Sequence, residues 1–326
     1  MNSEQPSPRP SPALREREEP GEAGRVRAGS SADPVNIGLI GKGARRTLSG
    51  HAPGRVIAVF KRSLYVETPG GLACLGAASL GAGPLNALSD RADGLDEPLA
   101  GLSVGAPVRI DGLRIDIDGR LSFSLDRATD WRPARGPWSV DRLGPGVAAL
   151  LDLALGRAPA DGLAPVTFRG EGPPQMIAAT AAFRDWLDDL ATAGPVADPP
   201  FDAEGLIGLG PGLTPAGDDY LGGALVALRA FGRADIADPL GTWVLAAARH
   251  RTTTISRAHL ALAAAGEGAE ALHVILEALA GGRIDRLAAG LDRIDSIGHT
   301  SGWDALAGAV AACAALDVFG RTSNAG

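Results

Sequence analysis

The stretch GLGPGLTPAGDDYLGG, residues 208–223, is dense in glycine and contains two prolines and the adjacent acids Asp218 and Asp219. It directly precedes an apolar run that has the spacing of a helix. A turn needs only one or two glycines, and each glycine in a helix interior costs about 1 kcal/mol of stability. The density therefore indicates that the backbone here approaches another group closely.

Thr214 and Pro215 mark the expected start of this helix, with Thr214 as N-cap and Pro215 as the first helical residue. The preceding loop, which includes Gly210 and Gly212, would then direct backbone N–H groups at a helix N-terminus, an arrangement that binds phosphate or carboxylate groups. The loop matches neither standard nucleotide-binding motif. Gly210, Gly212 and Thr214 are therefore predicted to bind a small anionic substrate.

Asp218 and Asp219 follow in the first helical turns. Two carboxylates beside an anion site would repel the ligand unless a cation lay between them, so they are predicted to bind Mg²⁺ or Mn²⁺ and to take part in catalysis. Alternatively, both acids only stabilise the positive end of the helix. Gly222 and Gly223, one turn further on, indicate a close helix crossing rather than ligand contact.

A second polar segment is RHRTTTISRAH, residues 249–259. On a helix, Thr252, Ser256 and His259 would form one polar stripe, although three consecutive threonines are poor helix formers and could break the helix. Thr252, Thr253 and Ser256 are predicted substrate-binding residues. The alternative is a stripe whose hydroxyls bond to nearby carbonyls.

The third segment is SIGHTSGWDALAG, residues 296–308, in which Thr300 or Ser301 is expected to cap a helix. Ser301 and Asp304 have a spacing similar to a capping box. Thr300 and Ser301 are predicted substrate-binding residues, and His299 is a candidate general acid or base because its ordinary pKa is near neutrality. The alternative for His299 is a capping or packing role. The three segments are expected to face one shared cleft.

The apolar pattern changes near residue 135 from short alternating runs to long Ala/Leu-rich segments with helical spacing, such as residues 240–265. The predicted fold class is α+β, with a small antiparallel β domain over residues 36–135 and a mainly α-helical domain over 136–326. Residues 1–35 contain almost no large apolar side chains and are predicted to be a disordered tail.

Composition limits the classes of function. A net charge of -7 and a pI near 5.3 argue against nucleic acid as a partner. No stretch has the length and apolar character of a membrane span. The two cysteines match neither a disulfide framework nor a metal-ligand spacing, so a cytoplasmic location is expected.

The motifs also resemble a known family. GLGPGLTPAGDDYLGG, TTTIS and IGHTSGWDALAG look like motifs of the AllH-type family, a subunit associated with oxamate carbamoyltransferase of anaerobic allantoin breakdown, and VIAVFKRSLYVETPGGLACL resembles its N-terminal β section. The likeness spans roughly residues 50–320. Ala216 stands where the family pattern has Ser, which argues against a hydroxyl role there.

The resemblance implies phosphorolysis of oxalurate to oxamate and carbamoyl phosphate, by a subunit that works beside two others. It transfers no catalytic residue to this chain. The first prediction is therefore an enzyme subunit that binds a small anionic substrate and phosphate, with no organic cofactor. The second is a non-catalytic scaffold or regulatory subunit whose apolar surfaces bind sister subunits.

Overall fold

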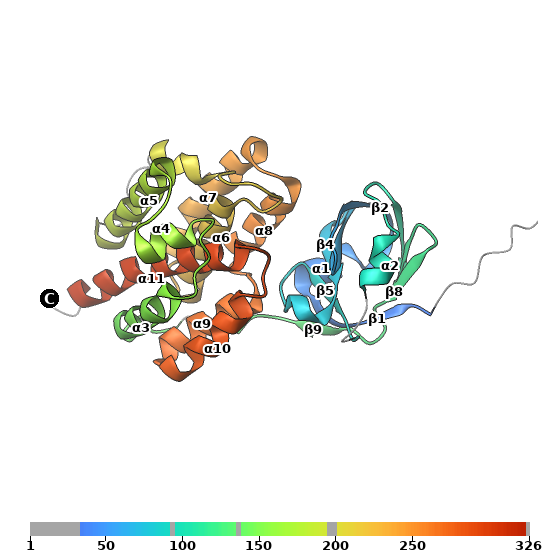
Figure 1. Ribbon diagram of the computed structural model, residues 1–326, viewed down its shortest axis with the longest axis horizontal. Helices are drawn as coiled ribbons and strands as arrows, with labels where there is room; N and C mark the ends of the chain where they lie inside the picture. Colours follow the sequence, from blue (N-terminus) through green and yellow to red (C-terminus); the bar gives the residue numbers. More distant parts are fainter. Residues whose placement is uncertain (1–32, 92–94, 135–137, 194–200, 324–326) are drawn as a thin grey trace, which may run out of the picture.

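The computed structural model describes residues 33–91, 95–134, 138–193 and 201–323. These residues form a β-barrel followed by a group of helices, side by side in Figure 1. Most of the predicted disordered tail, residues 1–32, lies outside the described residues.

The barrel consists of short strands with three small helices. The strands are β1 (Val35–Gly41), β2 (Gly50–Val59), β3 (Ser63–Thr68), β4 (Gly71–Gly76), β5 (Asn86–Ser89), β6 (Pro107–Gly112), β7 (Arg114–Ile117), β8 (Leu121–Ser124) and β9 (Thr129–Trp131). The helices are α1 (Lys42–Thr47), η1 (Ala78–Leu80) and α2 (Asp96–Ala100). The strand order is β5-β4-β3-β2-β6-β7-β8-β1, and β1 pairs back onto β5, so the sheet closes.

The prediction of a simple antiparallel β domain is wrong. Eight strands form a closed barrel, and β1 pairs in parallel with β8 and with β9, as β4 does with β5. Closure joins β1 to β5, which are far apart in the sequence. The alternation of apolar and polar residues along a strand indicates which face of the strand is buried, but it does not indicate which distant strand is its partner. Hairpin signals alone therefore favoured a locally connected antiparallel sheet.

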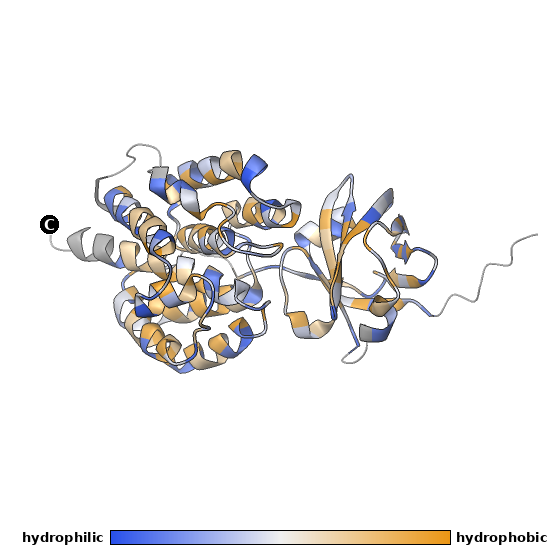
Figure 2. Ribbon diagram, turned by 45° about the horizontal axis from the view of Figure 1, so that its top comes forward, coloured by the Kyte–Doolittle hydropathy of each residue, from blue (hydrophilic) through white to orange (hydrophobic). Residues whose placement is uncertain are grey.

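The barrel interior is filled by its own apolar core. Ile37, Val56, Val66, Ile115 and Phe123 are fully buried there. Figure 2 shows apolar residues along both the strands and the helices, in keeping with a separate core in each part. Interior side chains that fill a barrel of this size make it a packed body rather than a channel.

The second part is helical. Its elements are α3 (Leu143–Leu155), α4 (Ala164–Arg169), α5 (Pro174–Ala193), η2 (Phe201–Leu206), α6 (Ala216–Ala230), α7 (Ala234–Arg251), α8 (Thr254–Ala264), α9 (Glu270–Gly281), η3 (Ile284–Arg286), α10 (Leu287–Ile294) and α11 (Ser301–Ser323). The continuous helical pattern over residues 240–265 is interrupted at the threonines. Thr253 caps α8 by accepting a hydrogen bond from the Ser256 N–H at 3.0 Å, so the local break is confirmed.

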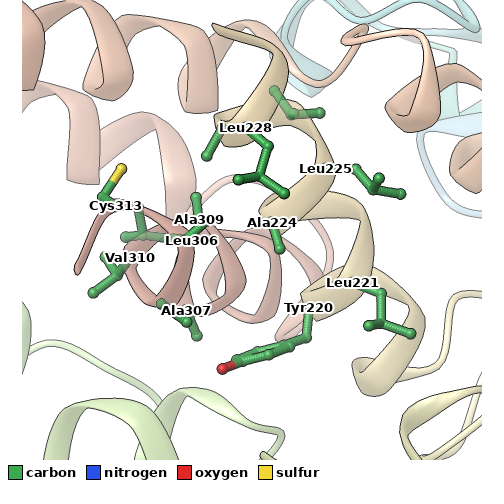
Figure 3. Packing of buried hydrophobic residues seen from close by; sticks show 14 of the residues in the cluster. Tyr220, Leu221, Ala224, Leu225, Leu228, Leu306, Ala307, Ala309, Val310 and Cys313 are labelled. Carbon is green, nitrogen blue, oxygen red and sulfur yellow. The ribbon is translucent and has the colours of Figure 1, made fainter. Parts of the chain in front are cut away.

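Helices α6 and α11 pack along each other at the centre of this part, with the apolar side chains of Figure 3 between them. A Cβ on Gly223 would lie 1.8 Å from the Ala305 carbonyl oxygen, and a Cβ on Gly308 would lie 1.8 Å from that of Tyr220. The two glycines therefore allow the helix backbones to touch. The predicted close crossing is confirmed for Gly223.

Within the described residues, no helix combines the length and apolar character needed to cross a membrane.

Candidate functional site

A pocket of about 510 Å³ lies between the barrel and the helices. The barrel contributes residues at the β2–β3 turn, on β3 and β4, and around η1, and the helical part contributes α6, α8 and the start of α11. Figure 1 shows α8 and the start of α11 on the side of the helices that faces the barrel. A concave site with a mostly apolar wall and a few polar groups is typical of small-molecule binding.

All three polar segments singled out in the sequence reach this pocket. Thr214, Ser256 and Ser301 line it, one from each segment, together with Asp218 and Asp219. The expected shared cleft is therefore present. Several other predicted site residues are not among its lining residues: Gly210, Gly212, Thr252, Thr253, His299 and Thr300.

Asp218 is buried and fully engaged in hydrogen bonds. Its Oδ1 accepts from the Gly208 N–H at 2.8 Å, and its Oδ2 accepts from the hydroxyls of Thr252 and Ser256, the latter at 2.6 Å. It thus joins the glycine-rich loop to the start of α8. Hydrogen bonds of this kind to a buried carboxylate hold the loop in place.

Asp219 is in a different position. Its Oδ2 is buried and has no hydrogen-bond partner among the described residues, and its side chain lines the pocket. Burial raises the pKa of Asp219 well above its ordinary value; the hydroxyls of Ser301 and Thr214 oppose this, and the charges of Asp304 and Asp218 add to it. A buried oxygen without a partner, on a residue that lines a cavity, is a natural contact for a ligand.

Gly208 in the loop and Gly217 in the first turn of α6 allow close contacts between backbone segments. Gly208 has a φ of +75°, and a Cβ there would lie 2.1 Å from the Arg251 carbonyl oxygen. A Cβ on Gly217 would lie 1.9 Å from the Leu206 carbonyl oxygen, and the Gly217 N–H donates to the Leu209 carbonyl at 2.9 Å. The close approach inferred from the sequence is therefore to neighbouring backbone.

The start of α6 differs from the predicted one. Pro215 is the N-cap without a side-chain capping bond, and the Thr214 hydroxyl instead lies 2.9 Å from that of Ser301. The N–H groups of Asp218 and Asp219 both donate to the Pro215 carbonyl, at 3.0 and 3.1 Å. These two donors are used inside the helix, and within the loop the N–H groups of Gly208 and Leu209 donate to Asp218 Oδ1 and to the Leu206 carbonyl. The anion cradle predicted for residues 208–214 stays a prediction.

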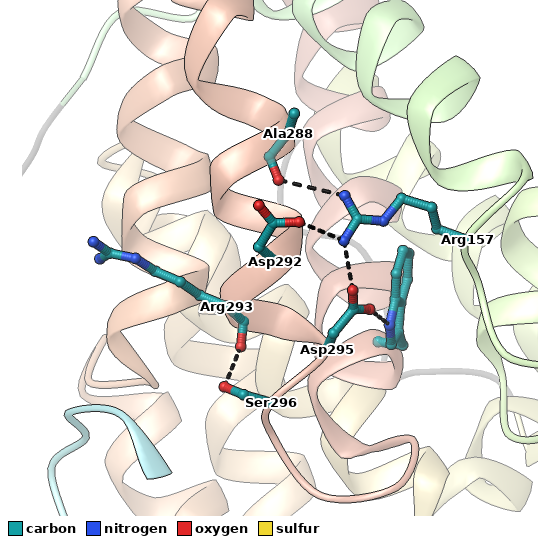
Figure 4. A network of polar contacts seen from close by, with 7 residues as sticks. Arg157, Ala288, Asp292, Arg293, Asp295 and Ser296 are labelled. Carbon is teal, nitrogen blue, oxygen red and sulfur yellow. Dashed lines mark hydrogen bonds and ion pairs between the residues drawn. The ribbon is translucent and has the colours of Figure 1, made fainter. Parts of the chain in front are cut away.

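The start of α11 is held by contacts with other helices. Asp304 Oδ1 accepts from the backbone N–H groups of Leu163 and Ala164, at 2.6 and 3.3 Å, and so caps α4. In the network of Figure 4, Asp295 accepts from Arg157 at 2.5 Å and from the Trp303 indole at 2.8 Å. These bonds position the loop that carries Ser301 beside the pocket.

His299 lies away from the pocket. Its side chain is 85% exposed, and its Nε2 lies 3.5 Å from Asp161 Oδ2 at the surface. The sequence reasoning missed a second histidine as a site residue: His259 lines the pocket, and its Nε2 lies 3.2 Å from the Tyr65 hydroxyl. The sequence did place His259 on one helical stripe with Ser256, and this position could have marked it as a site residue.

Three neutral groups meet on this wall. Burial lowers the pKa of His259 to about 4 and raises that of Cys74, which pairs with Tyr65 across β3 and β4, to about 12. Burial, followed by the neighbouring Cys74, also raises the pKa of Tyr65 well above its ordinary value. At neutral pH this wall therefore offers hydrogen bonds without charge. Both residues lie in the stretch VIAVFKRSLYVETPGGLACL, which resembled the family's β section, but nothing in that stretch singled out Tyr65 or Cys74 as site residues.

The predicted metal site has limited support. Over the described ranges of the chain, no group of three or more His, Cys, Asp or Glu side chains is arranged to hold a metal ion. Asp218 already accepts three hydrogen bonds, which leaves Asp219 as the carboxylate open to a ligand. Mg²⁺ and Mn²⁺ thus remain a prediction.

Comparison with known proteins bears on one part of the chain. No curated protein and no solved structure matches it. Residues 206–313, which run from the end of η2 into α11, match the family model of the oxamate carbamoyltransferase subunit AllH, and this confirms for that segment the resemblance expected from its motifs.

Proposed function

We propose that this protein is a subunit of a carbamoyltransferase of the oxamate type and that its pocket binds oxalurate or a similar ureido acid. One observation carries the proposal: the matched segment, residues 206–313, supplies α6, α8 and the start of α11, whose polar side chains line the pocket. The sister subunits and a cytoplasmic location are part of the same proposal.

The reaction is the transfer of a carbamoyl group. Phosphate oxygen bonds to the carbamoyl carbon of oxalurate, the bond from that carbon to the oxamate nitrogen breaks, and the phosphate proton passes to this nitrogen. Oxalurate and hydrogen phosphate thus give oxamate and carbamoyl phosphate with atoms and charge balanced. Catalysis requires the two anions to be oriented together and the departing nitrogen to receive a proton.

Asp219 is suited to the proton-transfer part of this task. Its raised pKa keeps it protonated to higher pH than an ordinary carboxyl group, and its Oδ2 is unoccupied by the described residues. Ser256 and Ser301 offer hydroxyls in the same pocket for hydrogen bonds to a ureido group. A Mg²⁺ or Mn²⁺ ion bound by Asp219 would instead polarise a substrate oxygen, and the role of metal belongs to the same test.

The test uses the complex that purifies with the tagged full-length chain, assayed for carbamoyl phosphate formed from oxalurate and phosphate. Gly222→Leu places a side chain in the pocket, where the nearest atoms to a Cβ are Ala263 Cβ at 3.6 Å and Leu260 Cδ2 at 3.9 Å. We expect Gly222→Leu and Asp219→Asn to lower kcat/KM at least about 100-fold, in the range of a lost catalytic proton donor. The exposed variants Gly156→Leu and Asp152→Asn serve as controls.

A non-catalytic scaffold is the second candidate, and the glycine contacts favour it because Gly208, Gly217 and Gly223 all serve backbone packing. A scaffold predicts full activity from every complex that assembles, including those with Gly222→Leu and Asp219→Asn. Intact assembly with lost activity supports the enzyme subunit. Adding chelator or Mg²⁺ to each assay shows whether a cation contributes.

A further inference from the structure

The pocket has opposite electrostatic character at its two ends. Among the described residues that line it, the basic ones are Lys61 and Arg62, and both are exposed, which places them at its mouth. Ser256 is only 1% exposed and lies at the inner end, near the neutral Tyr65 and His259. Charge therefore lies at the opening, and uncharged hydrogen-bonding groups lie deeper.

The acidic lining residues do not cancel this polarity. Glu267 lines the pocket, but its Oε1 is paired with Lys42 Nζ at 3.4 Å. Asp218 accepts three hydrogen bonds at the inner end, and burial raises the pKa of Asp219, the third acidic lining residue, which favours its neutral form. An anionic group entering the pocket thus meets its most favourable charges at the mouth.

The turn that carries the two cations is fixed relative to the pocket. The Phe60 N–H donates to the Ser63 carbonyl at 2.7 Å, the Ala77 N–H donates to the Arg62 carbonyl at 3.0 Å, and the Arg62 guanidinium lies 3.3 Å from the Ser79 hydroxyl. Elsewhere on the barrel, Ile255 of α8 packs against Ala58 of β2 and Leu72 of β4. The turn is therefore held at the mouth while the barrel packs against α8.

We propose that the turn Phe60–Arg62 of the barrel binds the anionic end of the ligand, and that the ligand's neutral amide or ureido end lies deeper, against the hydroxyls of Tyr65 and Ser256. The inference rests on the proposed function and deepens it, because it assigns specificity to residues outside the matched segment 206–313. The ligand class is a small molecule with one oxyanion group, a carboxylate or phosphate, at one end and an uncharged amide at the other. Arg and Lys are the side chains suited to oxyanions.

The experiment is a calorimetric titration of the full-length protein, as it purifies with its partner subunits, with oxamate, with neutral oxamide and with inorganic phosphate. Lys61→Gln, Arg62→Gln and the double variant are compared with Arg120→Gln, which makes the same charge change as each single variant at an exposed barrel residue that does not line the pocket. Each lost charge-assisted hydrogen bond is expected to weaken oxamate binding about tenfold or more. Added salt should weaken oxamate binding to the wild type and have less effect on the double variant.

The three ligands show whether the turn binds a carboxylate or a phosphate. A carboxylate site predicts that the double variant loses oxamate affinity and keeps its phosphate affinity, and a phosphate site predicts the reverse. Oxamide binding should be unchanged by either substitution. Equal oxamate and phosphate affinities in the double variant and in Arg120→Gln would overturn the inference.

Failure of the inference about the turn and failure of the proposed function give different results. If Gly222→Leu abolishes oxamate binding while the Lys61 and Arg62 variants do not affect it, the pocket binds substrate and only the inference about the turn is wrong. If neither oxamate nor phosphate binds the wild-type protein, and Gly222→Leu leaves the activity of the complex unchanged, both proposals are overturned.

Discussion

The starts of α6 and α11 look alike in sequence and differ in what their acids do. Each follows a glycine-containing loop, each carries aspartate in its first turns, and each lines the pocket. At α6, Asp218 binds the N–H of Gly208 in its own loop. At α11, Asp304 reaches another part of the chain and caps α4 through Leu163 and Ala164.

The comparison teaches that an acid near a helix start is weak support for a ligand site. Both Asp218 and Asp304 accept backbone hydrogen bonds and connect segments, which is a structural role. Asp219 and Asp304 each have a buried Oδ2 without a partner among the described residues, but of these two only Asp219 lines the pocket. Asp219 is therefore the candidate functional acid, because it combines an oxygen without a partner with a place in the pocket lining, whereas the oxygens of Asp218 are bonded and Asp304 does not line the pocket.

The largest expected effect concerns the crossing that holds the two helix starts together. Gly308→Ala should destabilise the protein by at least about 3 kcal/mol, because the new Cβ would lie 1.8 Å from the Tyr220 carbonyl oxygen and the helices must separate. Helix propensity alone predicts the opposite, a gain of about 1 kcal/mol. Urea unfolding of Gly308→Ala and of Gly156→Ala, whose Cβ would meet no atom within 4 Å, measures the difference. A stabilised Gly308→Ala would contradict the touching backbones.

The second prediction compares the adjacent acids. Asp218→Ala should lower the free energy of unfolding by about 3 kcal/mol, because it leaves buried donors of Gly208, Thr252 and Ser256 without their acceptor. Asp219→Asn should change it by less than about 1 kcal/mol, because Oδ2 has no hydrogen-bond partner among the described residues and the substitution removes a buried acid. Denaturant unfolding of both variants decides this, and equal losses would show that Asp219 is structural as well.

These contrasts also show what the sequence could predict. Local signals sufficed for the helix break at Thr253 and the close crossing at Gly223, since each depends on residue types within a few positions of one another. The convergence of three polar segments on one pocket was also predicted, although these segments are distant in the sequence. The matched family segment was also recognisable from its motifs.

The remaining features depend on contacts between distant residues. Barrel closure requires β1 to pair with β5, and the pattern of either strand is compatible with other partners. The sequence could not show which of His299 and His259 is the better candidate site residue. His259 is buried because α8 packs on the barrel, whereas His299 is exposed. Tyr65 entered the site by the same packing, and although the stretch around it resembled the family's β section, nothing in it singled out Tyr65 as a site residue.

The third prediction concerns the pH dependence of the stability that Asp304 contributes. Burial, the largest cause, raises the pKa of Asp304 from 3.8 to about 6, so its contribution to stability is fully present below pH 3.8 and is lost as the pH rises through about 6. The difference corresponds to about 3 kcal/mol between the two limits, from roughly 1.4 kcal/mol per pKa unit. Asp304→Asn keeps an acceptor for the Leu163 N–H and cannot ionise.

Unfolding is measured for wild type and Asp304→Asn at several pH values between 3.5 and about 7.5, a window set by that shift. The advantage of Asp304→Asn over wild type should grow with pH across this window. Asp152→Asn, at an exposed position, should keep a constant offset. Parallel profiles for Asp304→Asn and wild type would show that Asp304 is not held in its neutral form by burial.

The smallest expected effect tests the direct link between the two helix starts, the hydrogen bond between the Thr214 and Ser301 hydroxyls at 2.9 Å. Thr214→Val, Ser301→Ala and the double variant form a double-mutant cycle, for which we expect a coupling of about 1 kcal/mol in the free energy of unfolding. Because both hydroxyls also lie in the pocket near Asp219, the same cycle measured on oxamate affinity shows whether the pair serves the ligand. Coupling in the free energy of unfolding, with additive effects on oxamate affinity, would show that the hydroxyl pair stabilises the contact between α6 and α11 without serving the ligand. Coupling in both would mean that the two similar helix starts act as one binding unit, since a ligand would then respond to the bond that joins them.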